Sequence, residues 1–147
     1  MTPYAVSGTQ HAITVPPIDL QAEYHEISAE LELRLGRVLE SGRFILGPEV
    51  EEFEQNFARF VGTRYAIGVA SGSDAILLGL MALGVQEGDE VITTSFTFVS
   101  TVTSIVRLGA KPVLVDIEPE TFNLNPELIK SKITKRTRGI IPVHLYG

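Results

Sequence analysis

The chain has 147 residues, of which 44% are hydrophobic, and a formal net charge of −6. This length fits one domain with an apolar core, and the acidic balance disfavours a nucleic-acid-binding surface. The absence of cysteine excludes disulfides, zinc thiolate sites and cysteine nucleophiles, and it suits a cytoplasmic protein. We predict no metal site and no membrane span, since no apolar run reaches the roughly 18 residues that a spanning helix needs.

Two helices are predicted in the first part of the chain. Residues 1–17 are polar and contain proline, which predicts a flexible N-terminal arm without a signal peptide. A helix is predicted from about Asp19 to Glu40, because apolar residues recur there at steps of three and four. A second helix is predicted from Pro48 to Gly62, since proline is tolerated at the first helical position and the glutamates after it suit the helix dipole.

Strands and helices alternate after the second helix. We predict strands over residues 65–70, 90–94, 112–115 and 139–143. Between them we predict helices over 74–83 and 99–108 and a short helix from Pro126 to about Ile133. Strands joined through helices imply right-handed βαβ units and a mostly parallel sheet, so the fold class is α/β. Since we predict the last strand to be interior, residues 18–147 form an incomplete domain, and we expect the chain to be the N-terminal part of a longer protein.

The turn Ser71-Gly72-Ser73-Asp74 lies between the first predicted strand and its helix. Free N–H groups and the positive end of the helix dipole favour a phosphate or another anion there, and Gly72 permits close approach of the backbone. The motif in isolation is more typical of an ordinary capped turn. A nicotinamide-dependent Rossmann enzyme is disfavoured, because the turn lacks G-x-G-x-x-G and no acidic residue ends the strand over 90–94.

Six segments of the chain, in this order, resemble the DegT/DnrJ/EryC1/StrS family of sugar aminotransferases: Phe44–Glu54, Gly68–Ala75, Gly88–Thr93, Ser95–Thr101, Gly109–Val113 and Ile141–Gly147. The resemblance covers roughly residues 15–147. It implies the large domain of an aspartate-aminotransferase-like (fold-type I) enzyme that binds pyridoxal 5′-phosphate (PLP) and acts as a homodimer. It further implies transfer of an amino group, usually from glutamate, to a keto sugar carried by a nucleotide diphosphate, for amino-sugar or polysaccharide biosynthesis.

The resemblance also implies roles for particular residues. The backbone amides of Ser73 and Asp74 would hold the PLP phosphate beside Gly72, and Phe98 would stack on the pyridine ring. We expect the Asp74 side chain to point away from the phosphate and to cap the helix. Phe98 taken by itself is more typical of a core residue.

The catalytic residues of the family are not expected within this chain. The resemblance places the Schiff-base lysine, and the acidic residue that pairs with the ring nitrogen, beyond Gly147. No lysine of this chain stands in the matching context, so we assign no catalytic residue and expect the chain alone to be inactive. An alternative is a non-catalytic regulatory module that binds PLP or a sugar nucleotide. Phe44 and Gly47 could line a sugar pocket or merely connect the first two helices, while His144 is more typical of a scaffold residue and Tyr146 could face the site.

Overall fold

The structure is a computed structural model that describes residues 18–147, so the predicted arm over residues 1–17 lies outside the described residues. The chain divides into two compact units between Ile67 and Gly68. We call the described residues of the first the helical unit (18–67) and those of the second the sheet unit (68–147).

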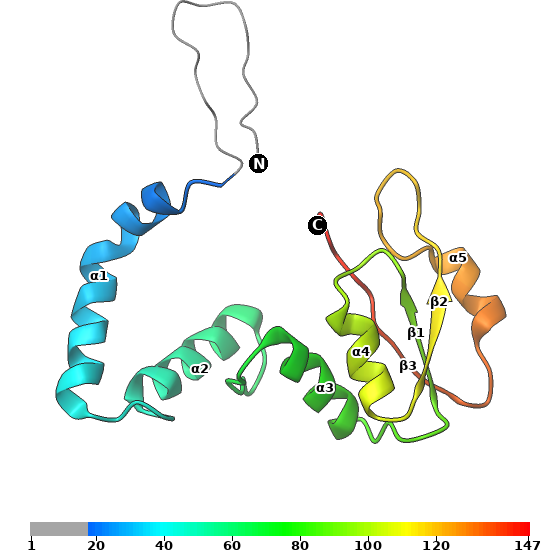
Figure 1. Cartoon of the computed structure of the whole chain (residues 1–147), viewed down its shortest axis with the longest axis horizontal. Coiled ribbons are helices and arrows are strands. Elements are labelled where there is room, and N and C mark those ends of the chain that lie inside the picture. Colours follow the sequence, from blue (N-terminus) through cyan, green and yellow to red (C-terminus); the bar gives the residue numbers. More distant parts are fainter. Residues whose placement is uncertain (1–17) are drawn as a thin grey trace, which may run out of the picture. The chain divides into compact units, whose positions relative to one another are not determined.

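The helical unit contains α1 (Leu20–Ser41) and α2 (Pro48–Val61), which confirms both predicted helices (Figure 1). The Asp19 side chain caps the start of α1 by accepting a hydrogen bond from the Ala22 N–H at 3.0 Å. Gly42 and Gly62 end the two helices with φ values of 63° and 77°, a left-handed conformation that glycine adopts without a steric penalty.

Gly47 is required sterically in the connection between α1 and α2. A Cβ atom at this position would lie 2.7 Å from the carbonyl oxygen of Arg43, a distance at which the backbone would have to shift. Phe44 and Gly47 also line a groove of about 410 Å³ in the helical unit. Gly47 therefore has at least a structural reason to be a glycine, whatever occupies the groove.

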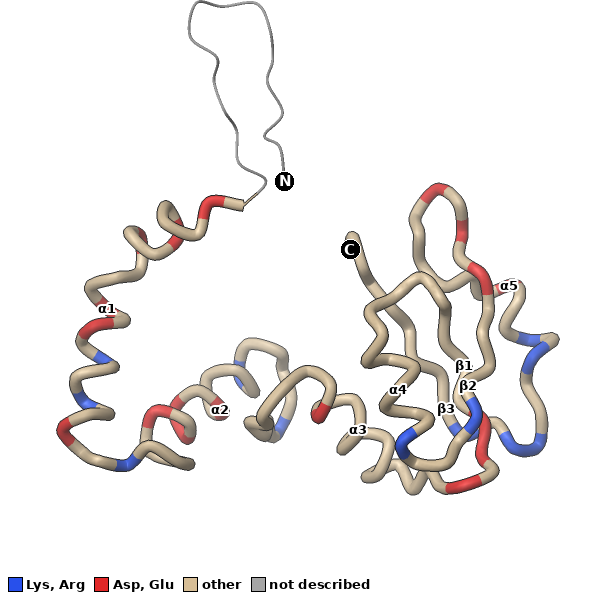
Figure 2. Tube along the Cα trace, in the orientation of Figure 1, with Lys and Arg blue, Asp and Glu red and all other residues tan. Residues whose placement is uncertain are grey.

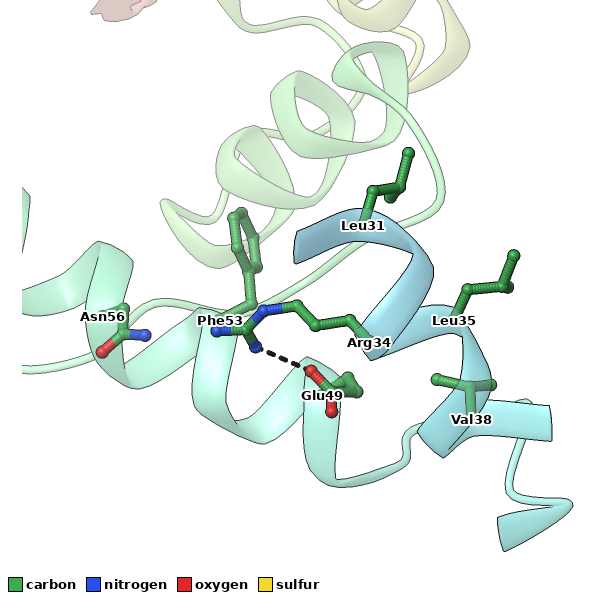
Figure 3. Close-up of a pocket in the computed structure, with 7 residues that line it drawn as sticks. All are labelled: Leu31, Arg34, Leu35, Val38, Glu49, Phe53 and Asn56. Atoms are coloured by element: carbon green, nitrogen blue, oxygen red, sulfur yellow. Dashed lines mark hydrogen bonds and ion pairs between the residues drawn. The ribbon is translucent and has the colours of Figure 1, made fainter. Parts of the chain in front are cut away.

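Ion pairs of Arg34 connect α1 with α2. Its guanidinium donates to Glu49 at 2.8 Å (Figure 3). It also donates to Glu52 at 3.1 Å, and within α1 it pairs with Glu30 at 3.0 Å. Hydrogen bonding to Arg34, assisted by its charge, lowers the pKa of the Glu52 carboxyl below its ordinary value. Arg34 and Glu49 also line an apolar groove of about 470 Å³. Its other lining residues include Leu31, Leu35, Val38 and Phe53.

The sheet unit alternates helices with parallel strands (Figure 1). Its elements are α3 (Gly72–Ala82), β1 (Glu90–Thr94), α4 (Ser100–Arg107), β2 (Lys111–Val115), α5 (Pro126–Ile129) with a 3₁₀ turn at Lys130–Lys132, and β3 (Thr137–Ile140). The strand order is β2-β1-β3, and β1 pairs in parallel with both neighbours. The predicted α/β class with a parallel sheet is confirmed.

The central strand β1 separates two apolar clusters, because successive side chains of a strand point to opposite faces. Val91 belongs to one cluster together with Leu80 of α3 and Ile105 of α4. Ile92 belongs to the other, with Val115 and Leu124, against which Ile129 of α5 packs. All five residues of β1 are buried, as expected for a strand covered on both faces.

Charged residues gather at the amino ends of the strands (Figure 2). The buried carboxylate of Glu90 accepts a hydrogen bond from the Thr134 hydroxyl at 2.6 Å and lies 3.4 Å from Nη2 of Arg136. Asp89 pairs in the same way with Arg138 at 3.3 Å. This edge of the sheet is thus occupied by structural ion pairs, which leaves the carboxyl edge for a ligand.

The prediction of a strand over residues 65–70 is wrong. The segment forms no strand, and the side chain of Ile67 is 81% exposed. A strand exists only when its backbone groups pair with a neighbouring strand, and the apolar run alone could not show whether such a neighbour is present. The last strand also differs from prediction in its bounds, since β3 spans Thr137–Ile140 and not residues 139–143.

Candidate functional site

Ser71 caps the first turn of α3. Its hydroxyl oxygen accepts a hydrogen bond from the Asp74 N–H at 3.1 Å, and its hydroxyl donates to the Asp74 carboxylate at 3.0 Å. This reciprocal pairing is close to a capping box, in which the cap and the third helical residue satisfy each other. The prediction that Asp74 would be the capping residue is therefore wrong, because the extended backbone of Ser71 puts the shorter side chain within reach of the free N–H.

Two backbone donors remain open at this turn. Gly72 and Ser73 come too early in α3 to have a carbonyl four residues back within the helix, so their N–H groups lack an intrahelical partner. A Cβ atom placed on Gly72 would meet no atom within 4 Å, which shows open space over the turn. The guanidinium of Arg107 lies 4.0 Å from the Asp74 carboxylate and partly offsets its charge. The turn can therefore accommodate an anion such as a phosphate.

Helix α4 holds the first turn of α3 in place. The Ser104 hydroxyl, in a side chain that is 1% exposed, donates to the carbonyl oxygen of Ser73 at 3.2 Å. Ser104 and Arg107 are three residues apart, so they lie on one side of α4 and both contact the same turn. Sequence reasoning missed Ser104, although a signal existed: Thr97, Thr101 and Ser104 recur at helical spacing and form a hydroxyl-bearing row.

Phe98 lies just before α4, on a loop that starts at the carboxyl end of β1. Its carbonyl oxygen accepts a hydrogen bond from the Thr101 N–H at 3.1 Å, and the hydroxyls of Thr97 and Thr101 are 2.8 Å apart. The Phe98 side chain is 71% exposed, so it is available to a ligand and is not the core residue that the isolated motif also allowed. The structure thus connects Phe98 and the Ser71–Asp74 turn through one helix, α4.

Other residues named from the sequence lie elsewhere. His144 is exposed, while the ring of Tyr146 is near those of Phe96 and Phe122. Lys111 begins β2 at the amino edge of the sheet, where its ammonium is 3.9 Å from the Glu90 carboxylate. Across residues 18–147 no cluster of His, Cys, Asp or Glu is suited to a metal ion, and no helix there has the length and hydropathy of a membrane span.

Comparison with characterised proteins identifies relatives of the whole described fold. The chain is 52% identical over 130 residues to the UDP-2-acetamido-2-deoxy-3-oxo-D-glucuronate aminotransferase of Pseudomonas aeruginosa. That alignment covers 88% of this chain but 36% of the relative. The chain therefore spans about a third of the length of such relatives.

Solved structures share this architecture. The crystal structure of S. venezuelae DesV in complex with a ketimine intermediate matches with a TM-score of 0.87 and 47% identity, over 90% of this chain and 36% of DesV. NtdA from Bacillus subtilis with the bound cofactor PMP matches with a TM-score of 0.79 and 41% identity, over 83% of this chain and 28% of NtdA. A model of the DegT/DnrJ/EryC1/StrS aminotransferase family matches residues 25–147. The resemblance seen in the sequence is thereby confirmed, and the chain belongs to the DegT/DnrJ/EryC1/StrS aminotransferase family.

Proposed function

We propose that this chain forms part of a PLP-dependent aminotransferase. In the whole protein, an amino group taken from glutamate is transferred to a keto sugar carried by a nucleotide diphosphate. The names of the relatives support the reaction and the substrate class, and the PMP held by NtdA supports the cofactor. The observation in this chain that carries the proposal is the first turn of α3, where open N–H groups face space that a phosphate can fill.

Each predicted site residue has a proposed task. Gly72 and Ser73 offer free N–H groups to the phosphate, and Gly72 has no side chain to keep it away. The Asp74 N–H is shared, because a phosphate would compete for it with the Ser71 hydroxyl. Phe98 offers an exposed ring as a surface for the pyridine. When bound, PLP supplies the electron sink that amino-group transfer requires.

We place the Schiff-base lysine outside this chain. Lys111 lies at the amino edge of the sheet, Lys130 and Lys132 lie in the turn after α5, and Lys135 lies between that turn and β3. None of these four lysines belongs to the α3 turn. Amino-group transfer requires a proton to move between the substrate carbon that carries the nitrogen and a carbon of the cofactor. Without the Schiff-base lysine the chain has no group to move this proton. We therefore expect residues 1–147 alone to bind PLP reversibly and to be inactive as a transaminase.

The assembly and the location of the protein are also proposals. Several apolar side chains of α1 are exposed, including Ile27, Leu31 and Leu35, and such surface favours association into a homodimer. Analytical ultracentrifugation across a concentration series tests this association. The absence of cysteine suits a cytoplasmic location.

The test is a titration of the chain with PLP, followed by fluorescence, with Gly72→Ala as the variant. A methyl group at position 72 causes no clash in the protein but occupies the space proposed for the phosphate, so PLP affinity should fall at least about tenfold. Gly79→Ala is the matched control, since it lies in the same helix, is equally open and should leave the affinity unchanged.

Borohydride reduction and intact mass then separate the alternatives. Reversible binding without a single-site pyridoxyl adduct supports the proposal. A stable adduct at one lysine of this chain would show that the catalytic lysine is misassigned. Binding of PLP that Gly72→Ala does not weaken would remove the α3 turn as the phosphate site. No reaction by a longer protein carrying this chain, despite PLP binding, would favour the non-catalytic regulatory module.

A further inference from the structure

Three aromatic rings from three separate loops meet at the carboxyl edge of the sheet. Phe96 follows β1, Phe122 lies between β2 and α5, and Tyr146 follows β3. The Phe96 and Phe122 rings are stacked with centroids 5.7 Å apart, and Tyr146 meets Phe122 edge-on at 5.6 Å. We call these residues the three-ring cluster. It joins segments that are distant in the sequence at the edge where open parallel sheets bind ligands.

The cluster is not part of the apolar core. The side chains of Phe96, Phe122 and Tyr146 are 39%, 41% and 72% exposed, and none of them belongs to the two buried clusters around β1. Their rings lie near one another in stacked and edge-on geometries of the kind that aromatic pairs prefer. The three-ring cluster therefore connects loops to one another and does not form part of a buried core.

Phe122 adopts an unfavourable backbone conformation to reach this position. Its φ is 59°, in the left-handed region that bulky residues rarely occupy. Hydrogen bonds fix the loop around it: the Phe122 N–H donates to the Glu118 carbonyl at 2.9 Å, and the Glu118 N–H donates to the Asn123 carbonyl at 2.9 Å. Strain of this kind persists where surrounding structure enforces it, and it is found often at functional sites.

The partner of Phe122 is on the loop that presents Phe98. On one side of Phe98, the Phe96 ring stacks on Phe122 and the Phe96 N–H donates to the Thr94 hydroxyl at 3.1 Å. On the other side, the Thr101 hydroxyl lies 2.8 Å from that of Thr97, so this pair spans Phe98. Phe98 itself is left exposed between these two anchors. Of the two, only the Phe96 anchor depends on a residue from another loop.

We propose that Phe122 is a positioning residue: by stacking on Phe96 it holds the Ser95–Val99 loop so that the exposed Phe98 ring faces the ligand in one orientation. The inference rests on the proposed function, because it concerns the loop that would carry the ring platform. Tyr146 supports Phe122 from the edge, and the Asn123 amide donates to the Gly147 carbonyl at 3.4 Å beside it.

The experiment compares two variants of the chain. Phe122→Asn removes the ring but keeps a residue that tolerates the left-handed backbone, so the loop can still fold. Phe122→Tyr keeps the ring and is the conservative control. The first measurement is amide hydrogen exchange at Phe96 and Thr101, which needs no cofactor. We expect Phe122→Asn to accelerate this exchange roughly two- to tenfold, the range that loss of one aromatic pair gives, and Phe122→Tyr to leave it unchanged.

The second measurement is the PLP dissociation constant of the same variants. We expect this dissociation constant to rise in Phe122→Asn by a factor similar to the increase in the amide exchange rate. In Phe122→Tyr it should stay at the wild-type value. Unchanged exchange in Phe122→Asn overturns the inference, and so does faster exchange with unaltered PLP affinity. Failure of the wild-type chain to bind PLP would count against the proposed function and would leave the exchange data to decide whether Phe122 holds the loop.

Discussion

The helical unit and the sheet unit are stabilised in different ways. In the sheet unit Val91, Ile92 and Ile105 are fully buried, and side chains from helices and strands pack against both faces of β1. In α1 and α2, Ala58 is the only buried residue, while charged side chains connect the two helices. Apolar burial contributes far more to stability than exposed ion pairs do. The comparison predicts that loss of a buried side chain perturbs the sheet unit most, and that the helical unit depends on its ion pairs and on the connection between α1 and α2.

The candidate site lies in the sheet unit, which is the more strongly packed of the two. The α3 turn is held by the buried Ser104 of α4, and the Phe98 loop leaves the buried strand β1. Groups that bind a ligand need a rigid support, and the packed sheet supplies it. By contrast, the grooves beside Arg34 and Phe44 lie between helices with few buried side chains.

The largest effect is expected from a cavity in the sheet unit. Ile92→Ala removes a fully buried side chain that packs with Val115 and Leu124, and it should lower the free energy of unfolding by about 2–5 kcal/mol. Leu33→Ala in α1 is the control, because its exposed side chain lies off the stripe of Ile27, Leu31 and Leu35 and should change stability by less than about 0.5 kcal/mol. Urea unfolding followed by circular dichroism measures both. Equal effects would mean that the two units do not differ in the way described.

A smaller effect is expected from the connection in the helical unit. In Gly47→Ala the new methyl group would meet the Arg43 carbonyl oxygen, so the variant should be destabilised by more than about 1 kcal/mol. Hydrogen exchange should locate the loss in α1 and α2 and leave β1 protected. Gly36→Ala, where a Cβ meets no atom, should be neutral or stabilising. Loss of protection in β1 as well would show that the units unfold together.

The buried charge at the amino edge provides a third test. Glu90→Gln keeps an acceptor for the Thr134 hydroxyl but removes the charge that faces Arg136, which should cost about 1 kcal/mol. The exposed Glu120→Gln is the control and should be neutral. Thermal melts of both variants at neutral pH give the comparison. A neutral Glu90→Gln would show that this ion pair does not add to the stability of the sheet unit.

The smallest effect concerns pH and the Arg34 ion pairs. Arg34 lowers the pKa of Glu52 in the folded chain, so the pair of Arg34 and Glu52 stabilises the fold. This stabilisation is fully present above about pH 4.5, the ordinary pKa, and is lost as the pH falls through the lowered pKa. An NMR titration of the Glu52 carboxyl should show the low pKa, and Arg34→Gln should return it toward 4.5. Added salt should weaken the shift, since both side chains are exposed. A low pKa that survives in Arg34→Gln would assign the shift to another group.

Local sequence signals predicted the helices closely, since caps and apolar spacing act within a few residues. Asp19 caps the start of α1, and Pro48 and Gly62 bound α2, as expected. The same signals failed for residues 65–70, because an apolar run of strand length does not reveal whether a pairing partner is present. For the site, Ser71–Asp74 and Phe98 could be named from their motifs, but the exchange of capping roles between Ser71 and Asp74 required the backbone geometry.

The sequence by itself determined the alternating helices and strands, the α/β class and the family, because each depends on short patterns or on segments in a constant order. Only the tertiary structure decided how distant residues meet. The bond from Ser104 to Ser73 crosses from α4 to α3, and the stacking of Phe122 on Phe96 joins two loops. Such contacts depend on how elements pack against one another, and no local propensity encodes that packing.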